Sequence, residues 1–147
     1  MVVVAGTFDI LHPGHVYLVE HAAKHGLVTV IVARDSTVLK VKGRPPVVPE
    51  EQRKAMVAHL KGVERAVLGH EGEDHLAVVV DLKPDVLVLG PDQDLDPEGV
   101  QRELRERGLS VRVVRLTKTC EDYPLCRSRK IKKKIVEIYC GKKESQS

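Results

Sequence analysis

The chain has 147 residues, a length that suits one domain with a single hydrophobic core. Hydrophobic residues make up 42% and charged residues 31%, a balance that excludes an intrinsically disordered chain. The net charge is only +3, and one Phe with no Trp offers no platform for stacking bases, so we expect no nucleic-acid partner.

The apolar runs of the sequence are too short for a membrane protein. Each of the longest, such as Val28–Ala33, holds four to six residues, whereas a helix that crosses a bilayer needs about 20. Met1 leads directly into valines, without the basic segment and cleavage site of a signal peptide. We therefore expect a protein that works in the cytoplasm and does not associate with a membrane.

Five valine-rich runs alternate with longer amphipathic stretches. The runs are continuous, as expected for strands of a parallel sheet that is buried on both faces. Three of the stretches begin at a proline, which the first turn of a helix tolerates. In chain order, the sequence predicts strand Val2–Ala5, helix Pro13–His25, strand Val28–Ala33, helix Pro49–Leu60, strand Ala66–Leu68, helix Asp74–Leu82, strand Val86–Leu89, helix Pro97–Arg107, strand Val111–Val114 and a last helix from about Ser128 to Ile138.

This alternation of strands and helices predicts a doubly wound α/β domain with a parallel five-stranded sheet. The domain is expected to span residues 1–140, and residues 141–147 are expected to form a flexible tail. Ligands of such sheets bind beyond the carboxyl ends of the strands, where the strand order reverses. The loops after the strands are therefore the candidate site, namely Gly6–His12, Arg34–Pro46 and Gly90–Asp96.

The loop between the first strand and the first helix reads GTFDILHPGH. Gly6 lets the strand turn sharply, and Gly14 leaves room for a ligand against the backbone. Free N–H groups in the first helical turn, together with the helix dipole, favour a phosphate there. His12 and His15 are three residues apart, so both imidazoles project to the same side and can stabilise charge on a transferring phosphoryl group. The other five histidines lack such a context.

The last quarter of the chain carries three cysteines and a basic run. An odd number of cysteines, spaced unlike zinc ligands, predicts neither a disulfide framework nor a metal site built by the protein. The run from Arg127 to Lys134 suits an acidic ligand, or it forms the solvated face of a terminal helix. Composition alone favours the solvated face.

The segment GTFDILHPGH resembles the signature of the cytidylyltransferase-like nucleotidyltransferases, a superfamily with a Rossmann-like fold. The resemblance covers nearly the whole chain. Further stretches are similar to the archaeal FAD synthetases, which transfer AMP from ATP to FMN. These stretches are Val32–Asp35, Lys40–Pro46, Pro49–Arg53, Leu89–Gln93 and the cysteine-bearing Cys120–Cys126.

The resemblance implies roles for individual residues. The two signature histidines would contact the triphosphate and stabilise the transition state, while Asp9 would organise the turn. Lys42 is the first candidate for a cation that reaches the phosphates, and Lys40 is the second. Asp92 would meet the nucleoside, although Gly90-Pro91-Asp92 also reads as an ordinary turn. The implied catalytic residues are His12 and His15, and the implied nucleotide-binding residues are Thr7, Phe8, His12, Pro13, Gly14, His15, Lys42, Asp92 and Ser128.

The second signature of the superfamily, near the last helix, departs from its usual form. It commonly reads Ile-Ser-Ser-Thr-x-Ile, whereas Cys126–Ile131 reads CRSRKI, so only Ser128 and Ile131 match. The arginines that replace small polar residues can still serve phosphate through bidentate contacts. Arg53, in contrast, is interpreted as an ion-pair residue of the second helix.

The reaction implied by the resemblance is a direct in-line displacement. The phosphate of FMN attacks the α-phosphorus of ATP and pyrophosphate leaves, with a divalent cation, Mg²⁺, as the expected cofactor. A homodimer is the habit of the family. The enzyme alternative is a cytidylyltransferase for glycerol 3-phosphate or another alcohol phosphate. The non-enzyme alternative is a nucleotide-binding sensor on the same fold, against which the intact pair of His12 and His15 argues.

Overall fold

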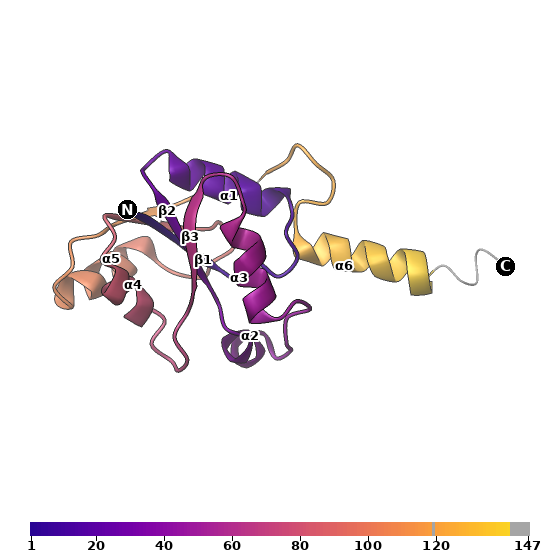
Figure 1. Cartoon of the computed structure of the whole chain (residues 1–147), viewed down its shortest axis with the longest axis horizontal. Helices are drawn as coiled ribbons and strands as arrows, with labels where there is room; N and C mark the ends of the chain where they lie inside the picture. Colours follow the sequence, from indigo (N-terminus) through magenta and orange to yellow (C-terminus); the bar gives the residue numbers. More distant parts are fainter. Residues whose placement is uncertain (119, 142–147) are drawn as a thin grey trace.

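Five parallel strands form one sheet in the order β3-β2-β1-β4-β5, as the computed structural model shows for residues 1–118 and 120–141 (Figure 1). The chain first moves from β1 outward to β3 and then returns to place β4 on the other side of β1. The predicted doubly wound sheet is therefore confirmed, with its reversal point between β1 and β4. The strands are β1 (Val2–Gly6), β2 (Val28–Val32), β3 (Val63–Leu68), β4 (Val86–Leu89) and β5 (Arg112–Arg115).

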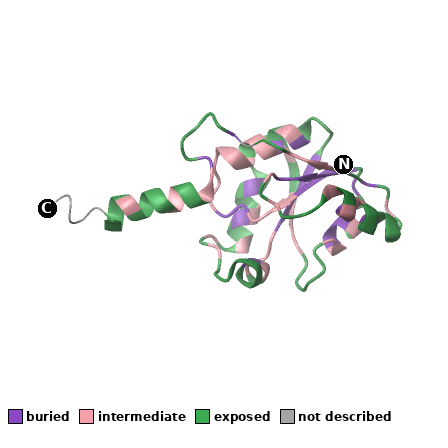
Figure 2. Cartoon of the chain, turned by 180° about the vertical axis from the view of Figure 1, so that it is seen from behind, coloured by how far each residue is buried: buried purple, intermediate pink, exposed green. Residues whose placement is uncertain are grey.

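Helices cover both faces of this sheet, because successive strand residues point to opposite sides. Val2 and Val4 pack with α1 (Pro13–Ala23) and α3 (Glu50–Ala58) in one core. Val3, which lies between them, packs in a second core with α4 (Ala77–Leu82) and α5 (Pro97–Glu106). The purple central strands of Figure 2 show this burial on both sides. The continuous apolar runs of the sequence follow directly from it.

A helix occupies much of the segment that we expected to be a loop after β2. This helix, α2 (Asp35–Lys42), ends at Gly43, whose φ of 77° provides a left-handed cap. Its start is held by another element, since Oε1 of Glu50 accepts a hydrogen bond from the backbone N–H of Asp35 at 2.8 Å. The prediction of a loop over Arg34–Pro46 is thus wrong for residues 35–42. The group that caps the start of α2 is Glu50 of α3, which lies too far along the chain to be recognised from the local sequence.

The other helix boundaries differ from the predictions by a few residues. Pro49 precedes α3 as its N-cap and is not part of the first turn. Asp74 lies outside α4, where its carboxylate accepts from the N–H of Leu76 and pairs with Arg107. Gly108, with a φ of 87°, follows the end of α5 in the left-handed conformation typical of a residue after a helix. No helix in residues 1–118 and 120–141 is long and apolar enough to span a membrane.

The last described helix extends away from the body (Figures 1 and 2). It comprises α6 (Ser128–Val136) and a π-helical segment, η1 (Glu137–Gly141), and neither contains a buried residue. The predicted last helix is therefore present, with its final turn wider than expected. The predicted domain end at residue 140 falls inside η1, and residues 142–147 of the predicted tail lie outside the described residues.

The guanidinium of Arg53, on α3, is completely buried and joins the carboxyl ends of β1 and β2. Its Nη1 donates to the carbonyl oxygens of Thr7 and Ala33, both at 2.7 Å, and its Nε donates to the carbonyl of Val48 at 2.8 Å. Its Nη2 pairs with Oδ1 of Asp35 at 2.7 Å. Arg53 thus forms the ion pair that we expected, and it also fixes the loop after β1.

We predict that Arg53→Ala destabilises the protein by about 3 kcal/mol, because three carbonyl oxygens and a carboxylate lose a buried, charged donor. Urea unfolding of the variant and the parent measures the difference. Lys54→Ala is the matched control, since it removes the next side chain of α3, which makes only an exposed pair with Glu51 at 3.5 Å. Equal losses in the two variants would contradict the role of Arg53.

Candidate active site

A cavity of about 1130 Å³ opens at the reversal point between β1 and β4. Pockets for one small ligand typically measure about 300–1,000 Å³, so this one is slightly larger than that range. Its walls come from the loops after β1 and β4, from α2 with the loop that follows it, and from α6. The predicted nucleotide-binding residues that line it are Thr7, Phe8, His12, Gly14, His15, Lys42, Asp92 and Ser128, whereas Pro13 begins α1 outside the lining.

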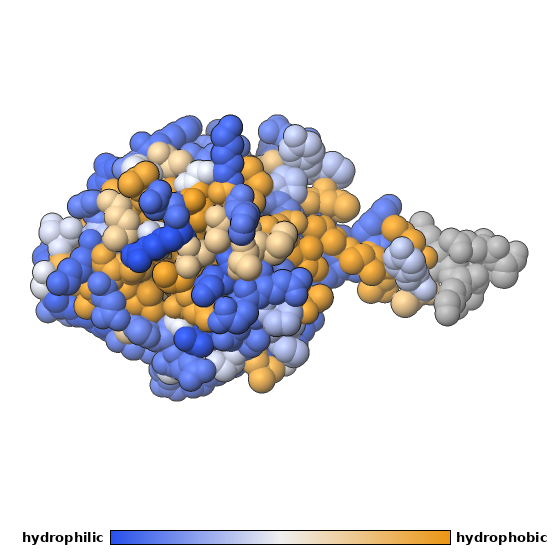
Figure 3. All heavy atoms as spheres, in the orientation of Figure 1, coloured by the Kyte–Doolittle hydropathy of each residue, from blue (hydrophilic) through white to orange (hydrophobic). Residues whose placement is uncertain are grey.

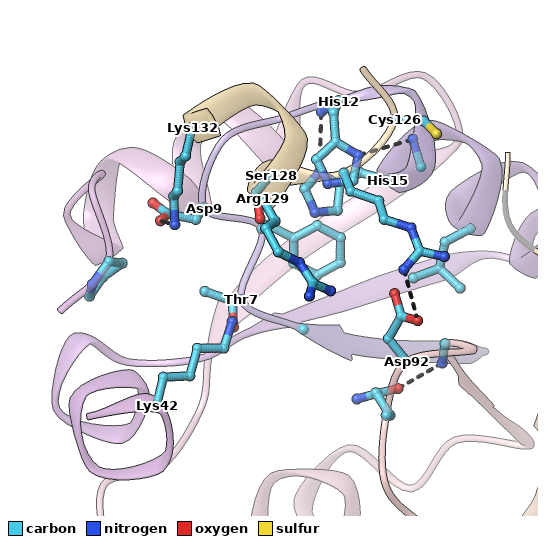
Figure 4. A pocket seen from close by; sticks show the side chains of 18 of the residues that line it. Thr7, Asp9, His12, His15, Lys42, Asp92, Cys126, Ser128, Arg129 and Lys132 are labelled. Carbon is cyan, nitrogen blue, oxygen red and sulfur yellow. Dashed lines mark hydrogen bonds and ion pairs between the residues drawn. The ribbon is translucent and has the colours of Figure 1, made fainter. Parts of the chain in front are cut away.

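His12 and His15 cap the start of α1 through each other (Figure 4). Nδ1 of His12 accepts a hydrogen bond from the N–H of Gly14 at 3.0 Å. Nδ1 of His15 accepts one from the N–H of His12 at 3.3 Å. The two rings stack with their centroids 3.7 Å apart. This arrangement is a capping box in which imidazoles replace the usual hydroxyl and carboxylate.

The capping box changes the expected source of phosphate binding. The N–H of His15 bonds to the carbonyl of His12, the N–H of Gly14 bonds to the His12 ring, and Pro13 has no N–H. The free backbone donors that we expected in the first turn are therefore already used. The positive end of α1 acts on the pocket through the two rings that cap it.

Capping also selects the tautomer of both histidines. A neutral imidazole that accepts at Nδ1 must carry its proton on Nε2, which then is a donor. Burial, and then the Arg127 guanidinium, hold the pKa of His12 below 6.5. Burial, His12 and Lys42 together lower the pKa of His15 to about 3, against an opposing effect of Asp9. Both histidines are therefore neutral Nε2–H donors at neutral pH.

Phe8 packs against the histidine pair, and two glycines, Gly6 and Gly14, leave the space that the packing around the pair requires. The ring of Phe8 is buried and packs against His15 with a centroid distance of 4.9 Å. A Cβ at Gly6 would lie 2.9 Å from the Phe8 ring. A Cβ at Gly14 would lie 2.6 Å from the carbonyl oxygen of Cys126, so only glycine lets the segment before α6 pack on the start of α1.

Asp9 organises more than its own turn. Its carboxylate accepts hydrogen bonds from the N–H groups of Val47 at 2.9 Å and Val48 at 2.8 Å. Oδ2 also pairs with Nζ of Lys132 at 3.3 Å. Burial raises the pKa of Asp9, but these donors outweigh it and keep the pKa below its ordinary value. One carboxylate therefore joins the loop after β1 to the loop after α2 and to α6.

The basic run of α6 faces the pocket along one side of the helix. Ser128, Lys132 and Val136 follow one another at four-residue spacing, and all three line the cavity together with Arg129 and Lys133. These residues line the pocket, while Arg129 and Lys133 are also exposed to solvent, so the interpretation of the run as a solvated face is not contradicted. The four-residue spacing from Ser128 places these residues on one side of the helix, and the sequence shows that much. The sequence does not show which side of the helix lines a pocket.

Two further expectations concern cations and the turn after β4. Lys40, the second candidate for a phosphate-binding cation, pairs instead with exposed Glu73 and does not line the cavity. The turn at Gly90 is held by Gln93, whose Oε1 accepts from the N–H of Gly90 at 2.7 Å. Asp92 projects from this turn into the pocket and faces Arg127 at 3.5 Å. Gln93 was not among the predicted site residues.

Acidic and sulfur ligands for a metal do not gather in this site. Among residues 1–118 and 120–141, no group of three or more His, Cys, Asp or Glu side chains is placed to hold a metal ion. Cys120 and Cys126 are buried as free thiols, and Cys140 is exposed. The lining of the pocket includes positively charged side chains, among them Lys42, Arg127 and Lys132.

Comparison with known proteins gives relatives along nearly the whole chain. FAD synthase of Methanopyrus kandleri is 47% identical over 142 residues, which cover 94% of this chain and 93% of that protein. FAD synthase of Archaeoglobus fulgidus is 48% identical over 139 residues, covering 93% and 98%. FAD synthase of Methanocella paludicola is 50% identical over 140 residues, covering 95% and 98%.

Solved structures share the fold. A protein of Thermoplasma volcanium, described as a lipopolysaccharide core biosynthesis protein, matches with a TM-score of 0.75 at 42% identity, covering 80% of this chain and 95% of that one. A protein of unknown function from Archaeoglobus fulgidus matches with a TM-score of 0.64 at 23% identity, covering 87% and 93%, which shows the fold alone.

A family model described as cytidylyltransferase-like matches residues 3–134. That range includes the sheet except Val2, the histidine pair and α6 except its last two residues. The chain therefore belongs to the cytidylyltransferase-like family.

Proposed function

We propose that this chain is an FAD synthase, which transfers AMP from ATP to FMN and releases pyrophosphate. The relatives named FAD synthase support the substrates, since they are 47–50% identical to this chain and align with at least 93% of it. The geometry supports the reaction type. Its central observation is the pair of neutral Nε2–H donors, His12 and His15, fixed beside lysine and arginine side chains at the reversal point of the sheet.

The reaction proposed is one in-line displacement at phosphorus. An oxygen of the FMN phosphate attacks the α-phosphorus of ATP and forms a new P–O bond. The bond from the α-phosphorus to the oxygen that bridges to the β-phosphate breaks, and pyrophosphate leaves with that electron pair. The FMN phosphate is already ionised at neutral pH, so no general base is needed, and positioning with charge stabilisation carries the catalysis.

Each part of the pocket has a role in this proposal. His12 and His15 donate from Nε2 to oxygens of the α-phosphate as negative charge grows on them. Lys42 and Ser128 bind phosphate oxygens, as do the neighbouring arginines of α6, which suit bidentate contacts. Asp92, on the side of β4, binds the ribose hydroxyls of ATP through its carboxylate. Thr7 supplies close backbone approach, whereas the carbonyl of Cys126 and the ring of His12 occupy the space at Gly14 that we expected to be open to a ligand.

The metal, location and assembly are also proposals. Mg²⁺ enters as the ATP complex, because this ion keeps several waters and binds mainly to substrate phosphates. The absence of a ligand cluster among the described residues fits such a delivered ion. We place the enzyme in the cytoplasm, where ATP is available, and we expect a homodimer by analogy with the family.

We predict that the protein, given FMN, ATP and Mg²⁺, forms FAD and pyrophosphate in equal amounts. Chromatography of the products checks this result. The comparison mixture contains glycerol 3-phosphate with CTP, from which we expect little product. Formation of CDP-glycerol while FMN stays unconverted would refute the FAD assignment and leave a cytidylyltransferase. Binding of ATP without any product would favour a nucleotide sensor.

We predict that His15→Ala lowers kcat by roughly 10²–10³-fold and leaves the KM for ATP within a few-fold, because one transition-state donor is lost. Steady-state kinetics of FAD formation measure both constants. The matched control is His21→Ala, also on α1, whose ring bonds to the carbonyl of Tyr17 and does not line the pocket. Near-normal kcat in His15→Ala would remove His15 from the reaction.

We predict that the histidine pair works in its neutral form. With pKa values below 6.5, both rings stay neutral as the pH rises from 6.5 to 8.5, so kcat does not fall over this range. At pH 7, long-range proton–nitrogen NMR of histidine-labelled protein should show Nε2 protonated and Nδ1 free in both rings. A kcat that decreases from pH 6 to 7.5, as an imidazolium would lose its proton, contradicts the neutral donors.

A further inference from the structure

The outer part of the pocket carries apolar residues on two sides, next to the lining cations Arg44 and Lys133. On one side, the loop after α2 presents Pro45, Pro46 and Val47 to the cavity. On the other side, Val136 occupies the outer end of the pocket-facing stripe of α6. Val47 is 65% exposed and Val136 is 56% exposed, so both have apolar surface free to bury. Apolar surface also continues from the body onto the base of α6 (Figure 3).

Asp9 brings these two walls next to each other. Its Oδ2 atom accepts from the N–H of Val47 at 2.9 Å and lies 3.3 Å from Nζ of Lys132. Val136 is four residues beyond Lys132, about 6 Å along α6, and lines the same cavity. The two prolines directly precede Val47 in the other wall. Asp9 therefore contacts both walls, and we call the space between them the slot.

The slot is rigid on one side and charged at its inner end. Each proline ring fixes its own φ and has no N–H that would need a partner, so this wall loses little freedom when a ligand binds. Lys42 and Lys132 line the cavity at the inner end of the slot, near the histidine pair (Figure 4). The slot therefore offers cations for a phosphate and, farther out, flat aliphatic walls.

We infer that this slot binds the isoalloxazine ring of FMN between Val136 and the loop Pro45–Val47, with the FMN phosphate at Lys42 and Lys132. The inference rests on the proposed function. FMN matches the slot because its phosphate and its flat, largely apolar ring lie at opposite ends of a ribityl chain. The other half of the pocket, where Asp92 projects from the loop after β4, remains for ATP, on the opposite side of the histidines in Figure 4.

The chain has no Trp, its single Phe is buried, and the aromatic residue Tyr17, which lines the cavity, packs on His21. Stacking on aromatic side chains is the common solution for such rings. Here aliphatic and proline side chains supply the apolar surface from two sides.

The test uses Val136→Ser and Val47→Ser, which remove apolar surface and leave the backbone contact of Val47 with Asp9 in place. We expect each to raise the KM for FMN about tenfold, as loss of a small apolar contact in a pocket does, with little change in the KM for ATP. Quenching of FMN fluorescence, without ATP, gives the same comparison as a dissociation constant. The matched controls are Ile135→Ser, next to Val136 on α6, and Val41→Ser on α2, since neither residue lines the cavity.

A probe without the ring separates ring binding from phosphate binding. Ribitol 5-phosphate keeps the phosphate and the chain of FMN, so its inhibition constant should be equal in the parent, Val136→Ser and Val47→Ser. An unchanged KM for FMN in both variants overturns the slot. Equal increases in the KM for FMN and the KM for ATP would show that the residues serve the general structure, which also overturns the slot. A change of mass in size-exclusion chromatography would assign them to a subunit interface, with the same consequence. Failure of the parent to form FAD instead refutes the proposed function.

Discussion

The site depends on one buried guanidinium. Arg53 carries a full positive charge into the interior, where it is stable only because three carbonyl oxygens and the carboxylate of Asp35 surround it. Those acceptors belong to the loop after β1, the residue that follows β2, the first residue of α2 and the loop before α3. Satisfying the charge therefore fixes every segment on one side of the pocket before any substrate arrives, which is the preorganisation that charge-stabilising catalysis needs.

In this pocket, the positive charge and the oriented hydrogen-bond donors come from different residues. Lysine and arginine side chains, such as Lys42 and Arg127, supply positive charge to the pocket, which suits the polyanionic substrates of the proposed function. The same cations, together with burial, keep the histidines neutral by lowering their pKa values. The histidines therefore contribute fixed hydrogen-bond directions and no net charge. Because the two rings cap α1, the positive end of the helix dipole reaches the pocket through them. The pair therefore caps the helix and also lies at the polar centre of the pocket.

The sequence was sufficient for the sheet and for the histidine pair, and insufficient where a feature depends on a distant partner. Continuous valine runs predicted all five strands, and the GTFDILHPGH segment predicted the residues at the reversal point. The helix α2 was not predicted because Glu50 and Arg53, from α3, stabilise its start. The expectation of free N–H donors was wrong because the ring of His12 uses the N–H of Gly14. The pocket-facing stripe of α6 depends on the contact of Lys132 with Asp9, which no local pattern reveals.

Asp9 has a consequence for the choice of acceptor. A single oxygen atom holds both walls of the outer slot, and the same residue belongs to the rigid loop that carries His12. In the proposed slot, Asp9 therefore links the loop that carries the histidine pair to both apolar walls. A slot of this kind would select acceptors by length: a molecule with a phosphate and a short polar chain fills only the charged end, whereas one whose ring reaches the walls is held at both ends. Discrimination among phosphorylated acceptors by such a slot would require no group that recognises the flavin by hydrogen bonding.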